Sequence, residues 1–300
     1  MQERSIDVQG KSIFFVEQGE YSQGEPTIVM LHGFPESHMT WQDCLDYLDD
    51  NLHVVVPDLP GYGQSAPLAE ATDYKIEKLI GRIAAFLSQV SPNKAVVLVA
   101  HDWGGAIAWP LAAFYPHLVE KLVIVNAVHP STFTREMIEN PKQREKSAYI
   151  HTLIGRDAEH ILVDNDCHYL VETVSKCIVP VPDSLLQAYK ANWTTSTTLS
   201  AMLEYYRQMP QLFPQSSLHR DDEETRAELA KIKIPNIRIE MPTLVLWGLN
   251  DEAFEPGVVN GIEEYVKDVE LIVEPNATHW LPRECPQWVS LQIERWLDSE

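Results

Sequence analysis

Residues 95–105 read Ala-Val-Val-Leu-Val-Ala-His-Asp-Trp-Gly-Gly. Ala95–Ala100 is a continuous apolar run of strand length, and a helix-like stretch follows it. The small residues Ala100 and Gly104 flank Asp102, which permits a tight turn from strand to helix. The pattern indicates a nucleophile elbow with aspartate as the nucleophile. The alternative is a helix N-cap, a common use of aspartate.

Strand-like and helix-like stretches alternate on both sides of this turn. The predicted strands are Ser12–Glu17, Thr27–Leu31, His53–Val56, Leu122–Val125, Thr243–Trp247 and Val269–Val273. The predicted helices are Asp73–Val90, Ala106–Tyr115, Gly257–Lys267 and Glu284–Leu297. Short apolar strands that alternate with helices predict an α/β protein with a mostly parallel sheet flanked by helices.

This alternation stops between about residues 129 and 238, where helix-like stretches and prolines contain no clear buried strand. We therefore predict one α/β core built from residues 1–128 and 239–300, with residues 129–238 inserted as a mainly helical cap. Such an insertion is expected at the carboxyl edge of the sheet, where open α/β folds bind their ligands.

The composition narrows the classes of function. The 300 residues carry 23 Lys and Arg against 44 Asp and Glu, a net charge of −21, and 45% are hydrophobic. This hydrophobic content excludes disorder, and the acidity argues against nucleic acid or anionic membranes as partners. Neither a secretory signal nor a membrane-spanning run is evident, and the four cysteines are scattered. Together these features predict a cytoplasmic protein with reduced thiols.

Five motifs give the chain a resemblance to the α/β-hydrolase fold family, and within it to the epoxide hydrolases. In chain order they are His32-Gly33-Phe34-Pro35, Asp58-Leu59-Pro60-Gly61-Tyr62-Gly63-Gln64-Ser65, His101-Asp102-Trp103-Gly104-Gly105, Trp247-Gly248-Leu249-Asn250-Asp251 and Thr278-His279-Trp280. The resemblance covers nearly the whole chain. Ala100 stands where the family usually has glycine, and it is small enough for the turn.

The resemblance implies a catalytic triad of Asp102, Asp251 and His279. It implies that Asp102 attacks an oxirane to form an alkyl-enzyme ester, which water activated by His279 and Asp251 hydrolyses to a vicinal diol. The peptide N–H groups of Phe34 and Trp103 would form the oxyanion hole. The alternatives to these catalytic roles are that Asp251 is only a turn residue and that His279 is only a histidine of a surface loop. Some relatives take the acid from the end of the sixth strand, but there this chain has an asparagine.

Epoxide opening also needs a donor to the leaving oxygen, and the resemblance places two tyrosines of the cap in that role. Tyr206 lies in Tyr205-Tyr206-Arg207-Gln208-Met209, and Tyr149 lies in Lys146-Ser147-Ala148-Tyr149-Ile150. A neutral phenol is a suitable donor to a developing alkoxide. The alternative is that both tyrosines only pack between helices. With Phe34 and Trp103, they would also contact the substrate.

The resulting hypothesis is a cofactor-free and metal-free epoxide hydrolase, a monomer or homodimer acting on a small, mostly apolar epoxide. Haloalkane and haloacid dehalogenases use the same triad, but Phe34 stands where haloalkane dehalogenases usually have asparagine. A non-catalytic binding protein on this scaffold is a third hypothesis. A metal-like group of residues has spacing that matches no ligand motif: His160, Asp164, Asp166, Cys167 and His168.

Overall fold

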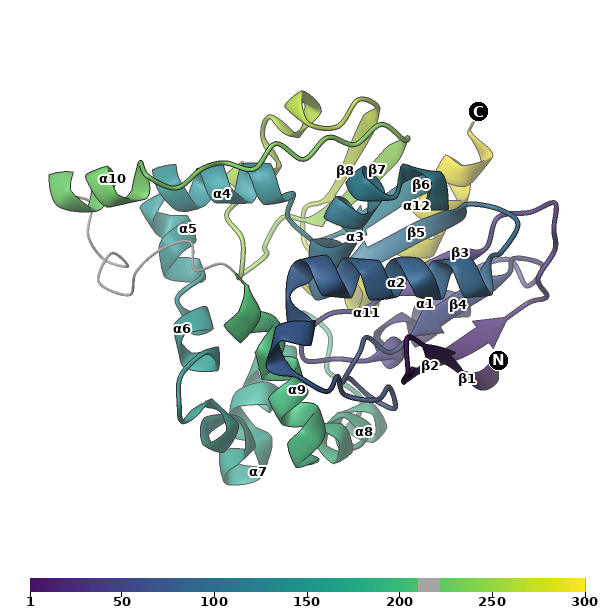
Figure 1. Cartoon of the computed structure of the whole chain (residues 1–300), viewed down its shortest axis with the longest axis horizontal. Coiled ribbons are helices and arrows are strands. Elements are labelled where there is room, and N and C mark those ends of the chain that lie inside the picture. The colour runs from purple at the N-terminus through teal and green to yellow at the C-terminus, as the bar shows by residue number, and fades with distance from the viewer. Residues whose placement is uncertain (210–221, 300) are drawn as a thin grey trace.

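The computed structural model, which describes residues 1–209 and 222–299, contains one eight-stranded sheet in the order β1-β2-β4-β3-β5-β6-β7-β8 (Figure 1). The strands are β1 (Gln2–Val8), β2 (Lys11–Gln18), β3 (Ile28–Leu31), β4 (Val54–Pro57), β5 (Val96–His101), β6 (Val119–Val125), β7 (Thr243–Gly248) and β8 (Val269–Glu274). β2 pairs antiparallel with β1 and with β4, and the other neighbours are parallel. The predicted mostly parallel sheet is therefore confirmed.

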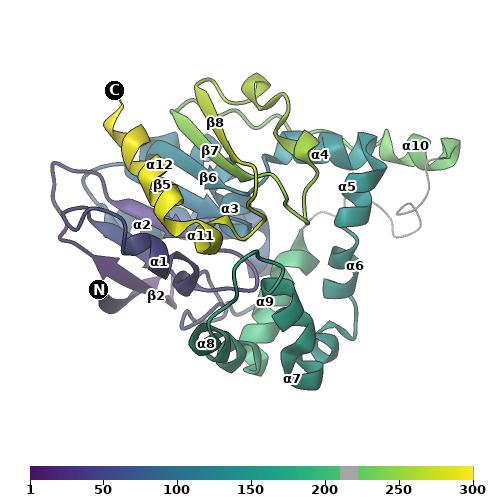
Figure 2. The same cartoon turned by 180° about the vertical axis from the view of Figure 1, so that it is seen from behind.

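Helices cover both faces of the sheet, so its strands are buried on both sides. One face carries α2 (Ile76–Val90) and α3 (Trp103–Phe114); the other carries α1 (Gln42–Leu45), α11 (Leu281–Glu284) and α12 (Pro286–Asp298) (Figures 1 and 2). Successive side chains of a strand point to opposite faces. Val29 and Leu31 of β3 accordingly pack in the core under α2 and α3, while Ile28 and Met30 pack in the core under α12.

A mainly helical insertion separates β6 from β7 and forms the cap (Figure 1). Its helices are α4 (Pro130–Glu139), α5 (Pro141–Lys146), α6 (Tyr149–Leu153), α7 (Ala158–Val174), α8 (Asp183–Trp193), α9 (Ser196–Gln208) and α10 (Glu223–Leu229). Across the described ranges 1–209 and 222–299, none of the helices combines the length and the apolar character that crossing a bilayer requires.

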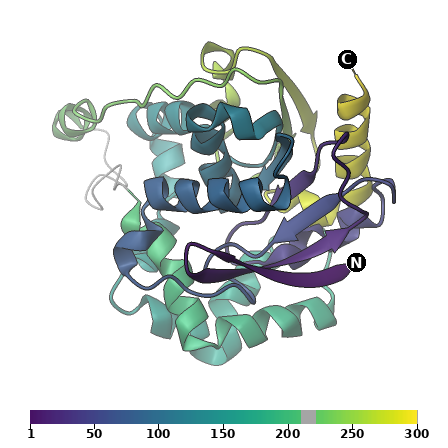
Figure 3. The same ribbon diagram turned by 45° about the vertical axis from the view of Figure 1, so that its right-hand side comes forward.

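Two of the differences from the sequence-based expectation have a clear physical reason. The helix predicted at Gly257–Lys267 is wrong: the segment holds only two short 3₁₀ helices, Pro256–Val259 and Ile262–Glu264. Asn260, which follows the first, is extended, and Gly261 has a left-handed φ of 71°, so the two do not join into a continuous helix. The second is β1, which the alternation did not reveal because most of its side chains are exposed. Figure 3 shows it paired with β2 in a hairpin at the edge of the sheet.

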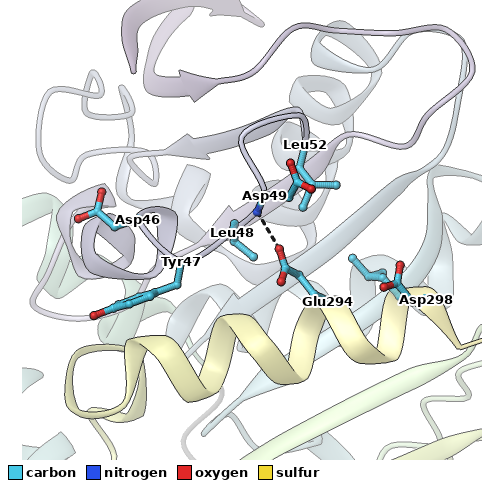
Figure 4. A pocket seen from close by; sticks show the side chains of 8 residues that line it. Asp46, Tyr47, Leu48, Asp49, Leu52, Glu294 and Asp298 are labelled. Carbon is cyan, nitrogen blue, oxygen red and sulfur yellow. Dashed lines mark hydrogen bonds between the residues drawn. The ribbon is translucent and has the colours of Figure 1, made fainter.

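A groove of about 380 Å³ lies between the segment that precedes β4 and the helix α12 (Figure 4). Its lining is rich in carboxylates: Asp46, Tyr47, Leu48, Asp49, Leu52, Glu294, Leu297 and Asp298. Because Leu52 comes just before β4 begins, the groove lies toward the amino edge of the sheet. The predicted catalytic residues follow strand ends, so they belong to the opposite edge.

Two glycine substitutions test the close packing of α3 against β3. A Cβ on Gly104 would lie 2.6 Å from the carbonyl oxygen of Leu31 and 2.7 Å from that of His32. A Cβ on Gly81 in α2 would meet nothing nearer than the Tyr115 hydroxyl at 3.9 Å. We expect Gly104→Ala to lower the free energy of unfolding by about 2 kcal/mol through overpacking. Gly81→Ala should raise it by about 0.5–1 kcal/mol through helix propensity.

Urea unfolding followed by circular dichroism measures both changes. Equal effects of the two substitutions would contradict the close approach at Gly104.

Candidate active site

Asp102 occupies a strained turn between β5 and α3. Its φ of 50° and ψ of −119° are rare for a residue with a side chain, and such strain is typical of functional turns. Its main chain is held by a 2.9 Å hydrogen bond from the Ala106 N–H to the Asp102 carbonyl. Although Asp102 precedes the first residue of α3, its side chain makes no capping hydrogen bond. Asp102 thus occupies the N-cap position of α3, but its carboxylate does not cap the helix and points elsewhere.

The Asp102 carboxylate meets a backbone donor and a histidine. Its Oδ1 accepts a 2.6 Å hydrogen bond from the Phe34 N–H, and its Oδ2 lies 3.5 Å from His279 Nε2. A Cβ on Gly33 would lie 2.1 Å from Oδ1, so only glycine permits this approach of the loop. Trp103 is the first residue of α3, where the peptide N–H has no partner within the helix. The structure thus brings Phe34, Trp103 and His279 around Asp102.

His279 links Asp102 to Asp251. Its Nδ1 lies 2.8 Å from Asp251 Oδ2, an arrangement in which the Nδ1 proton is donated to the carboxylate. Asp251 Oδ1 accepts hydrogen bonds from the peptide N–H groups of Ala253 and Phe254, at 2.7 and 3.0 Å. The acid side chain is thereby fixed in orientation, and His279 Nε2 is directed toward Asp102.

Asn126 completes this arrangement, and the sequence analysis did not include it among the site residues. Its Nδ2 donates a 2.8 Å hydrogen bond to Asp251 Oδ2, and its Oδ1 accepts one from the Gly248 N–H at 2.8 Å. An amide cannot replace the triad acid, but it can hold that acid. The sequence feature that could have indicated this role is the position of Asn126 directly after the sixth strand, where some relatives carry the triad acid.

Burial and paired charges set the protonation states in this cluster. Burial alone lowers the pKa of His279, but the charges of Asp251 and Asp102 outweigh it and raise the pKa to about 10. For Asp102, burial alone raises the pKa, but contact with the His279 ring and its charge brings it below its ordinary value. Burial and the neighbouring His279 lower the pKa of His101 to about 4, so His101 is neutral at pH 7. The free site thus holds one imidazolium between two carboxylates.

The two predicted cap tyrosines meet beside this cluster. The ring of Tyr206, on α9, lies edge-on to Trp103 and Phe34, with centroids 5.0 and 5.1 Å away. Tyr149, the first residue of α6, lies 6.2 Å from Tyr206, ring centroid to ring centroid. Burial, with the charge of Asp102 adding to it, raises the pKa of both phenols above the ordinary value. Both hydroxyls are therefore protonated at pH 7 and can donate.

The His, Asp and Cys residues of segment 160–168, considered above as metal ligands, do not form a cluster. Across residues 1–209 and 222–299, no three His, Cys, Asp or Glu side chains are grouped so that they could hold a metal ion. Residues 164–167 interrupt α7 with non-helical angles, and the Asp166 carboxylate pairs with Lys190 Nζ at 2.5 Å.

The chain is similar to known proteins over most of its length. The family model described as alpha/beta hydrolase fold matches residues 26–284. Human epoxide hydrolase 4 is 30% identical over 97% of this chain and 77% of its own length. The structure of an epoxide hydrolase from metagenomes of hot environments superposes with a TM-score of 0.86 at 29% identity, covering 100% of this chain and 99% of that one.

The structure of a Bacillus megaterium epoxide hydrolase in complex with an inhibitor superposes with a TM-score of 0.85 at 27% identity. The match covers 99% of this chain and 100% of that one. The likeness thus extends over the sheet and the cap together. The chain belongs to the α/β-hydrolase fold family, and within it to the epoxide hydrolase family.

Proposed function

We propose that this protein is a cofactor-independent epoxide hydrolase that adds water to a small, mostly apolar oxirane and releases a vicinal diol. Residues 129–238 would form the cap over a core of residues 1–128 and 239–300. The observation that carries the proposal is the position of Asp102, with a peptide N–H on one carboxylate oxygen and His279 facing the other. Two protonated phenols from the cap complete the set of groups that ring opening needs.

In the first step, Asp102 Oδ2 attacks a carbon of the oxirane ring, and the C–O bond of that carbon breaks. Oδ1 is the oxygen held by the Phe34 N–H, so it becomes the carbonyl oxygen of the new ester. Tyr206 and Tyr149 donate hydrogen bonds to the departing ring oxygen, which takes the phenolic proton of one of them. The carboxylate needs no base for this attack, because Asp102 is already ionised at neutral pH.

In the second step, His279 Nε2 takes a proton from water, and the resulting hydroxide attacks the carbonyl carbon of the ester. The Phe34 and Trp103 N–H groups stabilise the oxyanion, each contributing about 3 kcal/mol. Collapse of this intermediate breaks the bond between the carboxyl carbon and the diol oxygen, and the proton of the added hydroxyl passes to that oxygen, so the diol leaves and the Asp102 carboxylate is restored. Formation of the ester removes the negative charge of Asp102, one of the two that raise the pKa of His279. The imidazolium then releases its proton more readily, this proton restores the phenol that protonated the ring oxygen, and the neutral imidazole serves as the base.

A trapped intermediate tests both the reaction and its class. His279→Gln removes the base of the second step, so we expect incubation with styrene oxide to produce a stable adduct. Intact-protein mass spectrometry should show a mass increase equal to the entire epoxide, because ring opening expels no atoms. A dehalogenase would instead retain a halogenated alkane without its halide.

The matched control is Asp102→Ala combined with His279→Gln, which should form no adduct. An adduct that persists in the control would refute Asp102 as the nucleophile. A protein that is alkylated only by halogenated alkanes or haloacids would refute epoxide hydrolysis.

The two tyrosines should act in the first step alone. We expect Tyr206→Phe or Tyr149→Phe to slow alkylation by about 10–100-fold, because each removes one donor to the leaving oxygen and keeps the ring packing. Hydrolysis of the preformed ester should change by less than about twofold. Single-turnover kinetics with rapid quench separates the two rates. An unchanged alkylation rate would remove that tyrosine from the mechanism.

The two steps should also differ in their dependence on pH. The pKa of Asp102 lies below its ordinary value and those of the two phenols lie above theirs, so the alkylation groups keep their charge states near neutrality. Hydrolysis requires neutral His279, whose pKa is raised by carboxylates, so its rate should rise as pH increases. Between about pH 5 and 9, we expect flat alkylation and increasing hydrolysis in single-turnover measurements. Parallel profiles for the two steps would contradict these roles.

A further inference from the structure

The last residue of α5 is bound to the loop that carries the triad acid. We call residues 251–255 the acid loop. Lys146 Nζ donates to the carbonyl oxygens of Asp251 and Phe254, at 2.7 and 2.8 Å, and lies 3.2 Å from Glu255 Oε1. An ammonium group has three N–H donors, so these three oxygens account for all of them. Most surface lysines are solvated, whereas this one is directed into the core–cap boundary.

A second side chain of α5 forms hydrogen bonds with the same loop. Gln143 is fully buried, and its Nε2 donates to the Ala253 carbonyl at 3.0 Å. Its Oε1 accepts a 2.7 Å hydrogen bond from the Glu255 N–H. Within the loop, the Asp251 carboxylate accepts hydrogen bonds from the Ala253 and Phe254 N–H groups. The acid loop is therefore fixed from the cap side and from the triad side at once.

The same stretch of the cap leads directly to Tyr149. α5 ends at Lys146 and α6 begins at Tyr149, and Figure 1 shows the two helices following one another along one side of the cap. The junction is held by hydrogen bonds from the Ser147 N–H to the Gln143 carbonyl and from the Ile150 N–H to the Ser147 carbonyl, at 3.0 and 3.1 Å. Gln143 Nε2 also donates to Ser147 Oγ at 3.0 Å. A displacement of α5 from the acid loop would therefore displace Tyr149.

We propose that Lys146 is a positioning residue that holds Tyr149 at the reacting oxygen by fixing α5 to the acid loop. The inference rests on the proposed function, which gives Tyr149 and Asp251 their roles. Its physical basis is that misplacing a donor by about 1 Å can cost two orders of magnitude in rate. Lys146 itself touches neither Asp102 nor the substrate in this scheme; it acts through the helix.

The test compares two lysines of α5. Lys146→Met removes the ammonium and keeps the apolar stem, and Lys142→Met makes the same change at an exposed position one turn earlier. We expect Lys146→Met to slow alkylation by styrene oxide about tenfold and Lys142→Met to leave it unchanged. Equal rates in the two variants would overturn the proposal.

A double-mutant cycle separates positioning from general loosening of the cap. In a Tyr149→Phe background the donor that Lys146 positions is absent, so Lys146→Met should slow alkylation by less than about twofold. If Lys146→Met costs the same factor with and without the Tyr149 hydroxyl, the lysine acts by another route and the proposal fails.

Hydrogen exchange tests the physical link without relying on activity. Peptides that contain the Phe254 and Glu255 amides should exchange faster in Lys146→Met than in Lys142→Met. Unchanged exchange in Lys146→Met would refute the link even in an active enzyme. If the parent protein hydrolyses no epoxide, the proposed function fails, whereas faster exchange would still support the attachment of α5 to the acid loop.

Discussion

The backbone turn at Asp102 is the constraint on which the site depends. A φ of 50° at a residue with a side chain directs the carboxylate away from the helix that follows it. The turn is compatible with the fold because α3 starts against β3, where the Gly104 N–H donates to the His32 carbonyl at 2.9 Å. Gly33, on the loop after β3, leaves the space that the carboxylate occupies. The strain at one residue is thus supported by glycines from two separate segments.

The charges of the triad are compatible with burial because each has fixed partners. A buried carboxylate without partners is costly, but Asp251 accepts from two peptide N–H groups, Asn126 and His279. The chain carries a net charge of −21, yet the triad itself contains only two carboxylates and one imidazolium at neutral pH. The net charge of the chain and the chemistry of the triad are therefore independent. The net charge is spread over the surface, whereas the triad depends on contacts of a few ångströms.

The sequence could predict those parts of the structure that depend on local pattern. The apolar run before Asp102 and the small residues around it predicted the position of the turn, and motif order predicted which loops meet there. The contact between Asn126 and Asp251 joins residues 125 positions apart, so no local pattern contains it. The helix expected at Gly257–Lys267 failed because apolar spacing was given more weight than the left-handed conformation that Gly261 provides. β1 was missed because pairing with β2, not burial, holds it in the sheet.

In the proposed mechanism, the core and the cap contribute to different steps. Asp102, Asp251 and His279 follow β5, β7 and β8, so the nucleophile and the base belong to the rigid carboxyl edge of the sheet. Tyr149 and Tyr206 belong to α6 and α9, which reach this edge only through packing of the cap. Ring opening therefore takes its hydrogen-bond donors from the cap, whereas the groups that react in ester hydrolysis belong to the core. Because Gln143 and Lys146 of α5 also bind the acid loop, a shift of the cap would slow ring opening directly and would affect ester hydrolysis only through the position of Asp251.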